Sequence, residues 1–338
     1  MAKYKSCHGI EHGLVFNGVN LLTYCSLTRS QEEGGGEPQF VNSYCGEIID
    51  WDAFFKDRQE KREYIKNHGM LPQCKNCIYL EEKEWSGENK LEYILITNYI
   101  ACNSKCIYCP MPDPKNSKLY NIVPVLKDMI KKEIIKKDGR IEFAGGEPTI
   151  YKWFNEALKI INRNKFQHIV VNTNAIIFSK EIYNGIKNGV LEMVVSLDAG
   201  TKETHEKVKG VKSFDKVWKN LDKYSSVYKY REGGNLLKTK FIIVPSLNDT
   251  EEEIDLWLQR TAKTKIKNVS LNVDFQWIFT NTENVEGMKN ILDLADYFIV
   301  KAEEYNLIPD IYPNIKDIHH RYNKIVSDEN KHKNEYCK

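Results

Sequence analysis

The chain has 338 residues, of which 41% are hydrophobic and 28% are charged, and its formal net charge is +2. This length is enough to bury a proper core in one large domain or two moderate ones. The balanced charge gives no electrostatic case for binding nucleic acid. The chain contains no apolar run of eighteen residues, so we expect no transmembrane helix and no membrane partner.

The nine cysteines are many for a chain of this kind. The N-terminal run Met-Ala-Lys-Tyr-Lys-Ser-Cys lacks the apolar core of a signal peptide. Without an export signal, cysteines are better explained as metal ligands in a reducing compartment than as disulfides. We therefore expect a cytoplasmic protein that works where oxygen is scarce.

Residues 1–90 differ from the rest of the chain in their predicted elements and in their cysteine content. They are predicted to contain short strands around 14–24 and a glycine-rich loop at 34–36. The run Ser-Gly-Glu-Asn-Lys at 86–90 reads as a linker. This segment also holds five of the cysteines, which are Cys7, Cys25, Cys45, Cys74 and Cys77.

From residue 91 onward, apolar strands alternate with amphipathic helices. The predicted strands are 91–97, 140–143, 168–172, 191–197, 237–244 and 268–273, and the helices between them are 123–137, 153–164, 180–188, 214–228 and 251–264. Strands that each lead into a helix favour a parallel sheet, here an α/β fold curled into a partial (β/α)6 TIM-like barrel. Function is then expected at the carboxyl ends of the strands. A closing helix at 284–305 and a polar tail complete the chain, so the expected segments are 1–90, 91–280 and 281–338.

Three cysteines follow the first of these strands in a C-x3-C-x2-C spacing: Cys102, Cys106 and Cys109. Three thiolates on one short loop can bind three irons of a four-iron cubane cluster and leave the fourth iron open to an outside ligand. A zinc knuckle is the alternative, but structural zinc prefers four protein ligands, and no fourth lies nearby in the sequence.

This loop resembles the signature of the radical S-adenosylmethionine (radical SAM) superfamily, including the aromatic Tyr108 before the last cysteine. The resemblance implies a 4Fe-4S cluster whose open iron binds the amino and carboxylate groups of S-adenosylmethionine. It also implies that the adenine lies near Tyr108. A reductant of the flavodoxin or ferredoxin type is implied as a partner.

Further residues fit the same family. Gly145, Gly146 and Glu147, with Pro148, form a GGEP loop after the second strand, and the resemblance implies that this loop binds the methionine amino group. By the same resemblance Asn174, after the third strand, and Ser196, at the end of the fourth, contact the ribose or carboxylate. Each of these strand-end residues also has a simpler explanation as a turn cap. Lys209 is the candidate for the cofactor carboxylate, with Lys207 and Lys212 near enough to replace it.

The front segment resembles a twitch domain, the reduced form of the SPASM module, which holds one auxiliary 4Fe-4S cluster. Cys7, Cys25, Cys74 and Cys77 match its spacing, although such modules normally follow the barrel and this one precedes it. Four thiolates also suit tetrahedral zinc, so zinc stays an alternative here. Cys45 is the fifth cysteine of this segment and is not needed for a four-cysteine site. It could be an alternative ligand, a hydrogen-atom donor or an ordinary buried thiol.

The resemblance implies an oxidoreductase. The reduced cluster cleaves S-adenosylmethionine to a deoxyadenosyl radical, which removes a hydrogen atom from the substrate. The auxiliary cluster then accepts an electron, so that a sugar-like alcohol or a peptide is oxidised. A peptide-modifying maturase or epimerase is the alternative, with Cys45 as the thiol of an epimerase, and a non-catalytic iron–sulfur carrier is a third reading.

Overall fold

The structure is a computed structural model that describes residues 3–17, 20–22, 49–74, 77, 80–97, 101–109, 120–230 and 237–336. It divides into two compact units. Unit 1 comprises Met1–Cys102 and Met111–Asn172, and unit 2 comprises Asn103–Pro110 and Thr173–Lys338. Among the described residues, no helix has both the length and the apolar character needed to cross a membrane.

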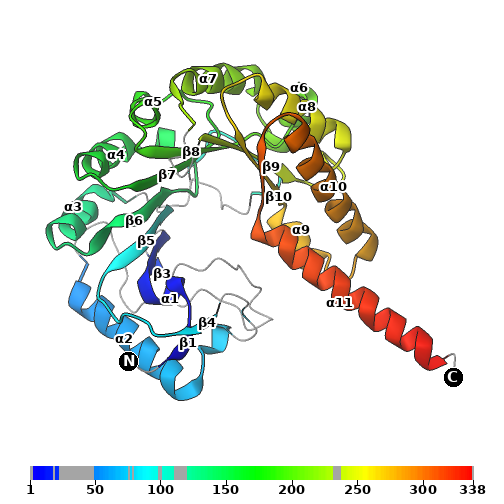
Figure 1. The fold of residues 1–338 in the computed structure, drawn as a ribbon. Coiled ribbons are helices and arrows are strands. Elements are labelled where there is room, and N and C mark those ends of the chain that lie inside the picture. The colour runs from blue at the N-terminus through cyan, green and yellow to red at the C-terminus, as the bar shows by residue number, and fades with distance from the viewer. Residues whose placement is uncertain are drawn as a thin grey trace. The chain divides into compact units, whose positions relative to one another are not determined.

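Unit 1 is built on a sheet with the strand order β3-β2-β5-β6-β7 (Figure 1). All neighbouring pairs are parallel except β2 with β3. A separate antiparallel ribbon pairs β1 with β4. The elements are β1 (Tyr4–Ser6), α1 (His8–His12), β2 (Gly13–Asn17), β3 (Asn20–Leu22), α2 (Trp51–His68), η2 (Pro72–Cys74), β4 (Glu81–Lys83), β5 (Leu91–Thr97), α3 (Val123–Lys131), β6 (Ile135–Phe143), η4 (Pro148–Ile150), α4 (Phe154–Arg163) and β7 (His168–Thr173).

Unit 2 is built on four strands in the order β8-β9-β10-β11, all parallel. Its elements are α5 (Lys180–Lys187), β8 (Leu191–Ser196), α6 (Lys202–Lys209), α7 (Phe214–Val227), β9 (Leu237–Ile243), α8 (Glu251–Ala262), β10 (Asn268–Val273), α9 (Phe275–Thr280), α10 (Val285–Glu304), β11 (Ile308–Ile311) and α11 (Pro313–Tyr336). Its core is aromatic at the centre, where Trp257 of α8 packs between Phe241 and Phe298, with ring centroids 5.2 and 5.9 Å away. This packing joins α8 and α10 to the sheet.

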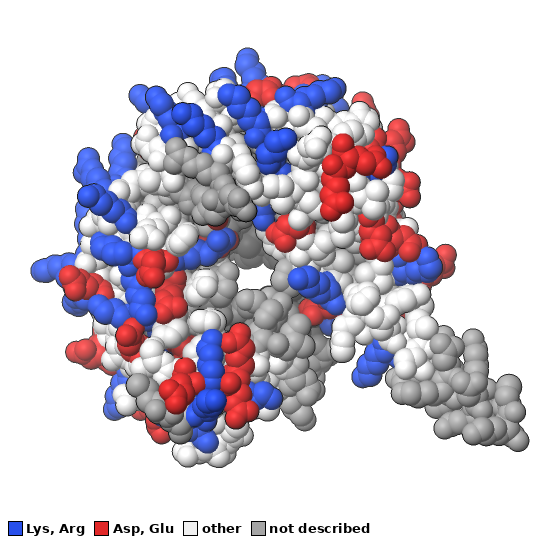
Figure 2. Space-filling view, in the orientation of Figure 1, with Lys and Arg blue, Asp and Glu red and all other residues white. Residues whose placement is uncertain are grey.

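The helices cover the sheet in the way their apolar spacing predicts. On α4 the buried residues Phe154, Leu158 and Ile161 recur every three or four positions and form one face. Figure 1 shows α3 and α4 together on one side of β6 and β7. On the face drawn in Figure 2, acidic and basic side chains lie interspersed rather than in a stripe of one sign.

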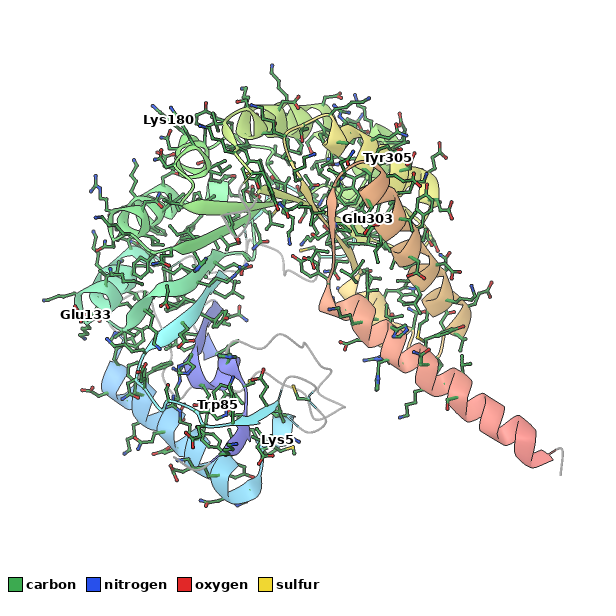
Figure 3. The ribbon with its side chains drawn as sticks, in the orientation of Figure 1. Lys5, Trp85, Glu133, Lys180, Glu303 and Tyr305 are labelled. Carbon is green, nitrogen blue, oxygen red and sulfur yellow. The ribbon has the colours of Figure 1, made fainter. Side chains whose placement is uncertain are left out.

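The predicted α/β fold with a parallel sheet is confirmed, and every predicted strand after residue 90 is present. The curvature of a partial barrel stays a prediction. The predicted helix 123–137 was wrong at its end, because α3 stops at Lys131 and residues 135–137 belong to β6. Glu133, labelled in Figure 3, takes a left-handed φ of 52° at the turn, which ends the helix. Ile135 then pairs with Leu91 as a strand residue.

The front segment packs differently from the expected separate module. Strand β2 pairs directly with β5, so residues before and after position 90 share unit 1. A SPASM or twitch arrangement is not confirmed, and the segments 1–90, 91–280 and 281–338 stay predictions about function. The Trp85 indole, labelled in Figure 3, donates a hydrogen bond of 3.1 Å to the Tyr4 carbonyl and ties the linker to β1.

Several elements were missed altogether, among them α2, α6, α9, β11 and α11. Helix α2 begins at the Asp50 cap, whose carboxylate accepts from the Ala53 amide at 3.0 Å, and ends at Gly69 with a φ of 84°. Both caps are readable in the sequence, but the helix is polar enough to hide its apolar face. The expected polar tail instead contains β11 and α11, since Pro309 and Pro313 mask the strand and the helix start in the sequence.

Candidate metal centre and cofactor loops

The cysteine loop follows β5, and the division between the units passes between Cys102 and Asn103. Cys102 and Cys109 are exposed, and Cys106 is half-buried. Within unit 2, the Cys109 amide donates to the Cys106 carbonyl at 3.1 Å, which closes a tight turn around Tyr108. Burial raises the pKa of the Cys106 thiol, and the nearby Lys209 ammonium opposes this. No disulfide joins the cysteines that the structure describes.

The arrangement of the described metal-binding side chains bears on which group these thiols could hold. Among the described residues, no three His, Cys, Asp or Glu side chains gather closely enough to bind one metal ion. A single zinc ion needs its ligands to converge on one point. Thiolates are the donors that the irons of a cubane take, each at its own corner. Within unit 2 the loop offers two such donors, the half-buried Cys106 and the exposed Cys109.

Unit 2 holds its part of the cysteine loop by backbone contacts. The Lys105 amide donates to the Lys209 carbonyl at 2.9 Å, and the Ile107 amide donates to the Val208 carbonyl at 3.0 Å. These bonds attach the loop to the last turn of α6. Gly210 ends that helix in the left-handed conformation, with a φ of 64°, and a Cβ placed there would lie 2.7 Å from the Lys105 carbonyl oxygen. Glycine is what allows the loop to approach so closely.

Replacing Gly210 with alanine is expected to lower the free energy of unfolding by about 2–3 kcal/mol, from left-handed strain of ~1–2 kcal/mol and the added clash. Gly189→Ala is the matched control, because Gly189 has a φ of 69° but nothing within 4 Å of a Cβ. Denaturant unfolding of both variants measures the difference. Equal losses in the two variants would mean that the close approach to Lys105 contributes nothing.

The side chains of Tyr108, Asp198 and Lys209 form a buried cluster in unit 2. The Tyr108 hydroxyl donates to Asp198 Oδ2 at 2.5 Å, and Lys209 Nζ donates to the same carboxylate oxygen and to the Tyr108 oxygen, the latter at 3.1 Å. Asp198 is 0% exposed and Lys209 is 2% exposed. Burial and the Asp198 charge raise the pKa of Tyr108. Lys209 is thus paired inside the protein rather than presented to solvent.

The other strand-end residues of unit 2 lie on the same elements as expected. Asn174, directly after β7, donates through Nδ2 to Asn103 Oδ1 at 2.7 Å and to Ser104 Oγ at 3.1 Å. It therefore holds the cysteine loop from a second direction. Ser196 is the last residue of β8 and pairs with Lys240 of β9.

The GGEP loop lies in unit 1, next to the start of the cysteine loop. The Glu147 amide donates to the Ala101 carbonyl at 2.8 Å, and Ala101 directly precedes Cys102. Gly145 has a φ of 100°, a conformation that side chains rarely adopt, and Gly146 follows it. The Glu147 side chain is buried and caps η4, since Oε1 accepts from the amide and hydroxyl of Thr149 at 3.1 and 2.6 Å.

The structure describes three of the front cysteines, Cys7, Cys74 and Cys77, all in unit 1. Cys7 and Cys74 both pack against a small apolar cluster formed by Ile10, Ile65 and Leu71. The Cys77 amide donates to the Cys74 carbonyl at 3.0 Å, which makes the turn expected of a C-x2-C pair. Burial raises the pKa of the Cys7 thiol, and the charge of Cys77 adds to this. Cys25 and Cys45 lie outside the described residues.

His205 lies near the buried ion pair of Asp198 and Lys209 in unit 2. Its Nε2 lies 3.0 Å from Ser213 Oγ, and the residue is nearly fully buried. Burial, with the Lys209 charge adding to it, lowers the pKa of His205 to about 4. The unfolded chain then binds a proton that the folded chain rejects between about pH 6.5 and pH 4, so stability falls as the pH falls through this window.

Because of His205, we expect the free energy of unfolding to fall by about 2 kcal/mol when the pH is lowered from 7.5 to 5. Denaturant unfolding at the two pH values should show the loss in the parent protein and a smaller loss in His205→Gln. The exposed His168, changed to Gln, is the control and should leave the pH dependence as it was. An identical slope in His205→Gln would contradict the assignment.

Of the residues that organise the loop, sequence reasoning selected Tyr108, Asn174 and Lys209. It did not select three others, which are Asp198, Gly210 and Asn248. Asp198 stands two positions after Ser196, but nothing in the sequence says that it meets Tyr108, 90 positions away. Gly210 carried a readable signal, because a glycine that follows a helical pattern marks a helix end. Asn248, which bonds to the backbone around Asp198, gave no signal at all.

Comparison with known proteins gives a consistent result. Residues 99–260 match the family model of the radical SAM superfamily. The chain is 25% identical over 183 residues to GTP 3',8-cyclase of Clostridium botulinum (strain Okra / Type B1), covering 52% of this chain and 54% of that protein. It is also 25% identical over 173 residues to GTP 3',8-cyclase of Haemophilus influenzae (strain PittEE), covering 49% and 50%. The chain thus spans about half the length of the curated relatives it matches.

Among solved structures, the fold is similar to SuiB of Streptococcus suis. The TM-score is 0.52 at 16% identity over 77% of this chain and 54% of SuiB. For SuiB bound to its precursor peptide SuiA, the TM-score is 0.51 at 14% identity over 91% and 72%. At such identities the likeness concerns the fold alone. Together with the cysteine loop, the family match identifies residues 99–260 as a radical SAM superfamily domain.

Proposed function

We propose that this protein is a radical SAM oxidoreductase that removes a hydrogen atom from its substrate and passes the remaining electron to a second cluster. The observation that carries the proposal is the anchored cysteine loop. Its thiols stand on a loop held by Asn174, by the last turn of α6 and by the Tyr108 hydroxyl. A loop fixed in this way presents metal ligands in one geometry before the metal arrives.

Cys102, Cys106 and Cys109 would hold the 4Fe-4S cluster, and the GGEP backbone at Gly145–Glu147 would bind the amino group of S-adenosylmethionine. Asn174 and Ser196 remain candidates for its ribose. Binding of its carboxylate by Lys209 would require the buried pair with Asp198 to open. When bound, the cluster and S-adenosylmethionine supply a deoxyadenosyl radical, which removes hydrogen from a substrate carbon.

Cys7, Cys25, Cys74 and Cys77 are proposed to hold an auxiliary 4Fe-4S cluster. The packing of Cys7 and Cys74 around one apolar cluster supports a shared site, and zinc is the competing occupant. A fully ligated cluster has no open iron, so electron transfer is the use that remains for it. With it, a sugar-like alcohol or a peptide would lose two electrons and two protons in total. A flavodoxin- or ferredoxin-like protein would supply electrons to the first cluster.

The test is anaerobic reconstitution with iron and sulfide, followed by reduction in the presence of S-adenosylmethionine. We expect about eight irons per chain, because two four-iron clusters would be bound. We also expect release of deoxyadenosine. About four irons with one zinc would retain the radical chemistry but remove the electron acceptor. Intact clusters without any deoxyadenosine would overturn the proposal and support a non-catalytic iron–sulfur carrier.

A peptide-modifying maturase or epimerase is the second candidate. The fold similarity to SuiB, which was solved with a precursor peptide, favours testing peptides first. GTP belongs in the same screen, because the curated relatives are named GTP 3',8-cyclases. Substrate-dependent consumption of S-adenosylmethionine is the readout.

Replacing Cys45 with alanine separates epimerisation from oxidation. An epimerase needs a thiol to return hydrogen to the opposite face, so Cys45→Ala should still cleave S-adenosylmethionine but should lose product by at least about tenfold. An oxidase should keep its turnover. Mass measurement of the product gives the independent check, since oxidation removes two hydrogens and epimerisation leaves the mass unchanged.

A further inference from the structure

We infer that Asp198 is the residue that positions the cysteine loop for cluster binding, with Tyr108 and Lys209 as the side chains through which it acts. This inference rests on the proposed function. It differs from the roles expected for Tyr108 and Lys209, which were contacts with the cofactor. It is argued from the hydrogen bonds on the two sides of the Asp198 carboxylate.

On one side Asp198 is fixed to the sheet of unit 2. Its Oδ1 accepts from the Ile242 amide of β9 at 2.9 Å, and its backbone carbonyl accepts from Asn248 Nδ2 at 2.8 Å. The same Asn248 amide group donates to the Ile242 carbonyl at 2.8 Å, and its Oδ1 accepts from the Val244 amide at 2.6 Å. Asp198 and Asn248 are both 0% exposed. The carboxylate therefore has one position relative to β9.

On the other side Asp198 holds the cysteine loop. Its Oδ2 accepts from the Tyr108 hydroxyl and from Lys209 Nζ. The Lys209 ammonium also lies 5.6 Å from the centre of the Tyr108 ring, and the Lys209 carbonyl accepts from the Lys105 amide. Lys209 thus contacts the loop through its backbone and its side chain at once.

The position of Tyr108 in the sequence explains why its contact with Asp198 affects the cysteines. Tyr108 stands between Cys106 and Cys109, so fixing its ring restricts the backbone that carries both thiols. Because Asp198 and Lys209 are oppositely charged and buried together, neither can leave without exposing the other charge to an apolar surrounding. The arrangement therefore persists when no cluster is bound. Replacing residues that orient metal ligands without binding the metal typically lowers metal affinity by about 10–100-fold.

The first test measures how firmly the reconstituted protein holds iron. Transfer of iron to an excess of chelator under anaerobic conditions should be about 10–100-fold faster in Asp198→Asn and in Tyr108→Phe than in the parent protein. Tyr108→Phe keeps the Asp198–Lys209 pair and loses only the hydroxyl, so it serves if Asp198→Asn does not fold. Asp215→Asn is the matched control, because Asp215 pairs with Lys202 on the surface at 3.1 Å. Parent-like iron transfer in a folded Tyr108→Phe would overturn the inference.

The second test needs no cluster. Hydrogen exchange of the Lys105 and Ile107 amides reports the two backbone bonds that join the loop to α6. In cluster-free Tyr108→Phe these amides should exchange at least about tenfold faster, while core amides of β9 keep their protection. Unchanged protection of both amides would overturn the inference. If the parent protein retains no iron while Tyr108→Phe shows this local loss of protection, the proposed function is refuted and the positioning role of Asp198 stands.

Discussion

Replacing Cys106 with alanine is expected to abolish release of deoxyadenosine, with a fall in rate of at least about 10³-fold that corresponds to ~4 kcal/mol in the free energy of activation. Of the three thiols on the loop, Cys106 is the half-buried one, and it lies two positions before the anchored Tyr108. Removing its sulfur takes away one of three iron ligands, and the remaining two cannot hold a cubane in place. Cys102→Ala and Cys109→Ala should behave alike.

The measurement combines iron content, the optical spectrum and deoxyadenosine release on anaerobically reconstituted protein. Ile107→Ala is the matched control, since Ile107 is 61% exposed on the same loop and carries no ligand atom. It should keep its iron and lose less than about twofold in rate. If all three cysteine variants kept the iron and spectrum of the parent protein, the cluster would lie elsewhere and the proposed function would fail.

The strands of the fold were predictable because their apolar runs are unambiguous. The strand at Leu91–Thr97 was predicted at the bounds that the structure has, with Leu91, Ile94 and Ile96 buried. The prediction failed at the boundary between α3 and β6, where no glycine or proline separates the two elements. Helix α3 passes into β6 through Glu133, an ordinary helix-forming residue that here adopts a left-handed conformation.

In residues 1–90 the sequence predicted a strand but not the strand with which it pairs. The short strand β2 was expected, but its pairing with β5 was not, because nothing local in Gly13–Asn17 specifies partners 80 positions away. The same applies to the site. Motifs located Cys106, Tyr108 and Lys209, while the contact that joins Tyr108 to Asp198 exists only in the folded chain. Long-range partners of buried polar groups depend on tertiary packing, which pattern reasoning does not reach.

Replacing Glu253 with alanine is expected to destabilise unit 2 strongly. Glu253 lies in the first turn of α8 and is only 8% exposed. Its carboxylate accepts from the amides of Gly200 and Thr201 at 2.6 and 3.1 Å, and from the hydroxyls of Thr201 and Thr204 at 2.7 Å each. Each donor left without an acceptor costs ~1–3 kcal/mol, so after partial relaxation we expect a loss of about 3–5 kcal/mol.

The effect should reach the cysteine loop, because the donors that Glu253 binds begin α6 and the far end of that helix carries Lys209. Glu253→Gln should lose less than Glu253→Ala, since one oxygen remains to accept from the two threonine hydroxyls. Glu252→Ala is the control: Glu252 is exposed in the same helical turn, and its favourable interaction with the helix dipole amounts to about 0.3–1 kcal/mol. Denaturant unfolding orders the three variants, and iron transfer to a chelator from the reconstituted proteins should follow the same order. A Glu253→Ala variant as stable as Glu252→Ala would show that the start of α6 does not depend on this carboxylate.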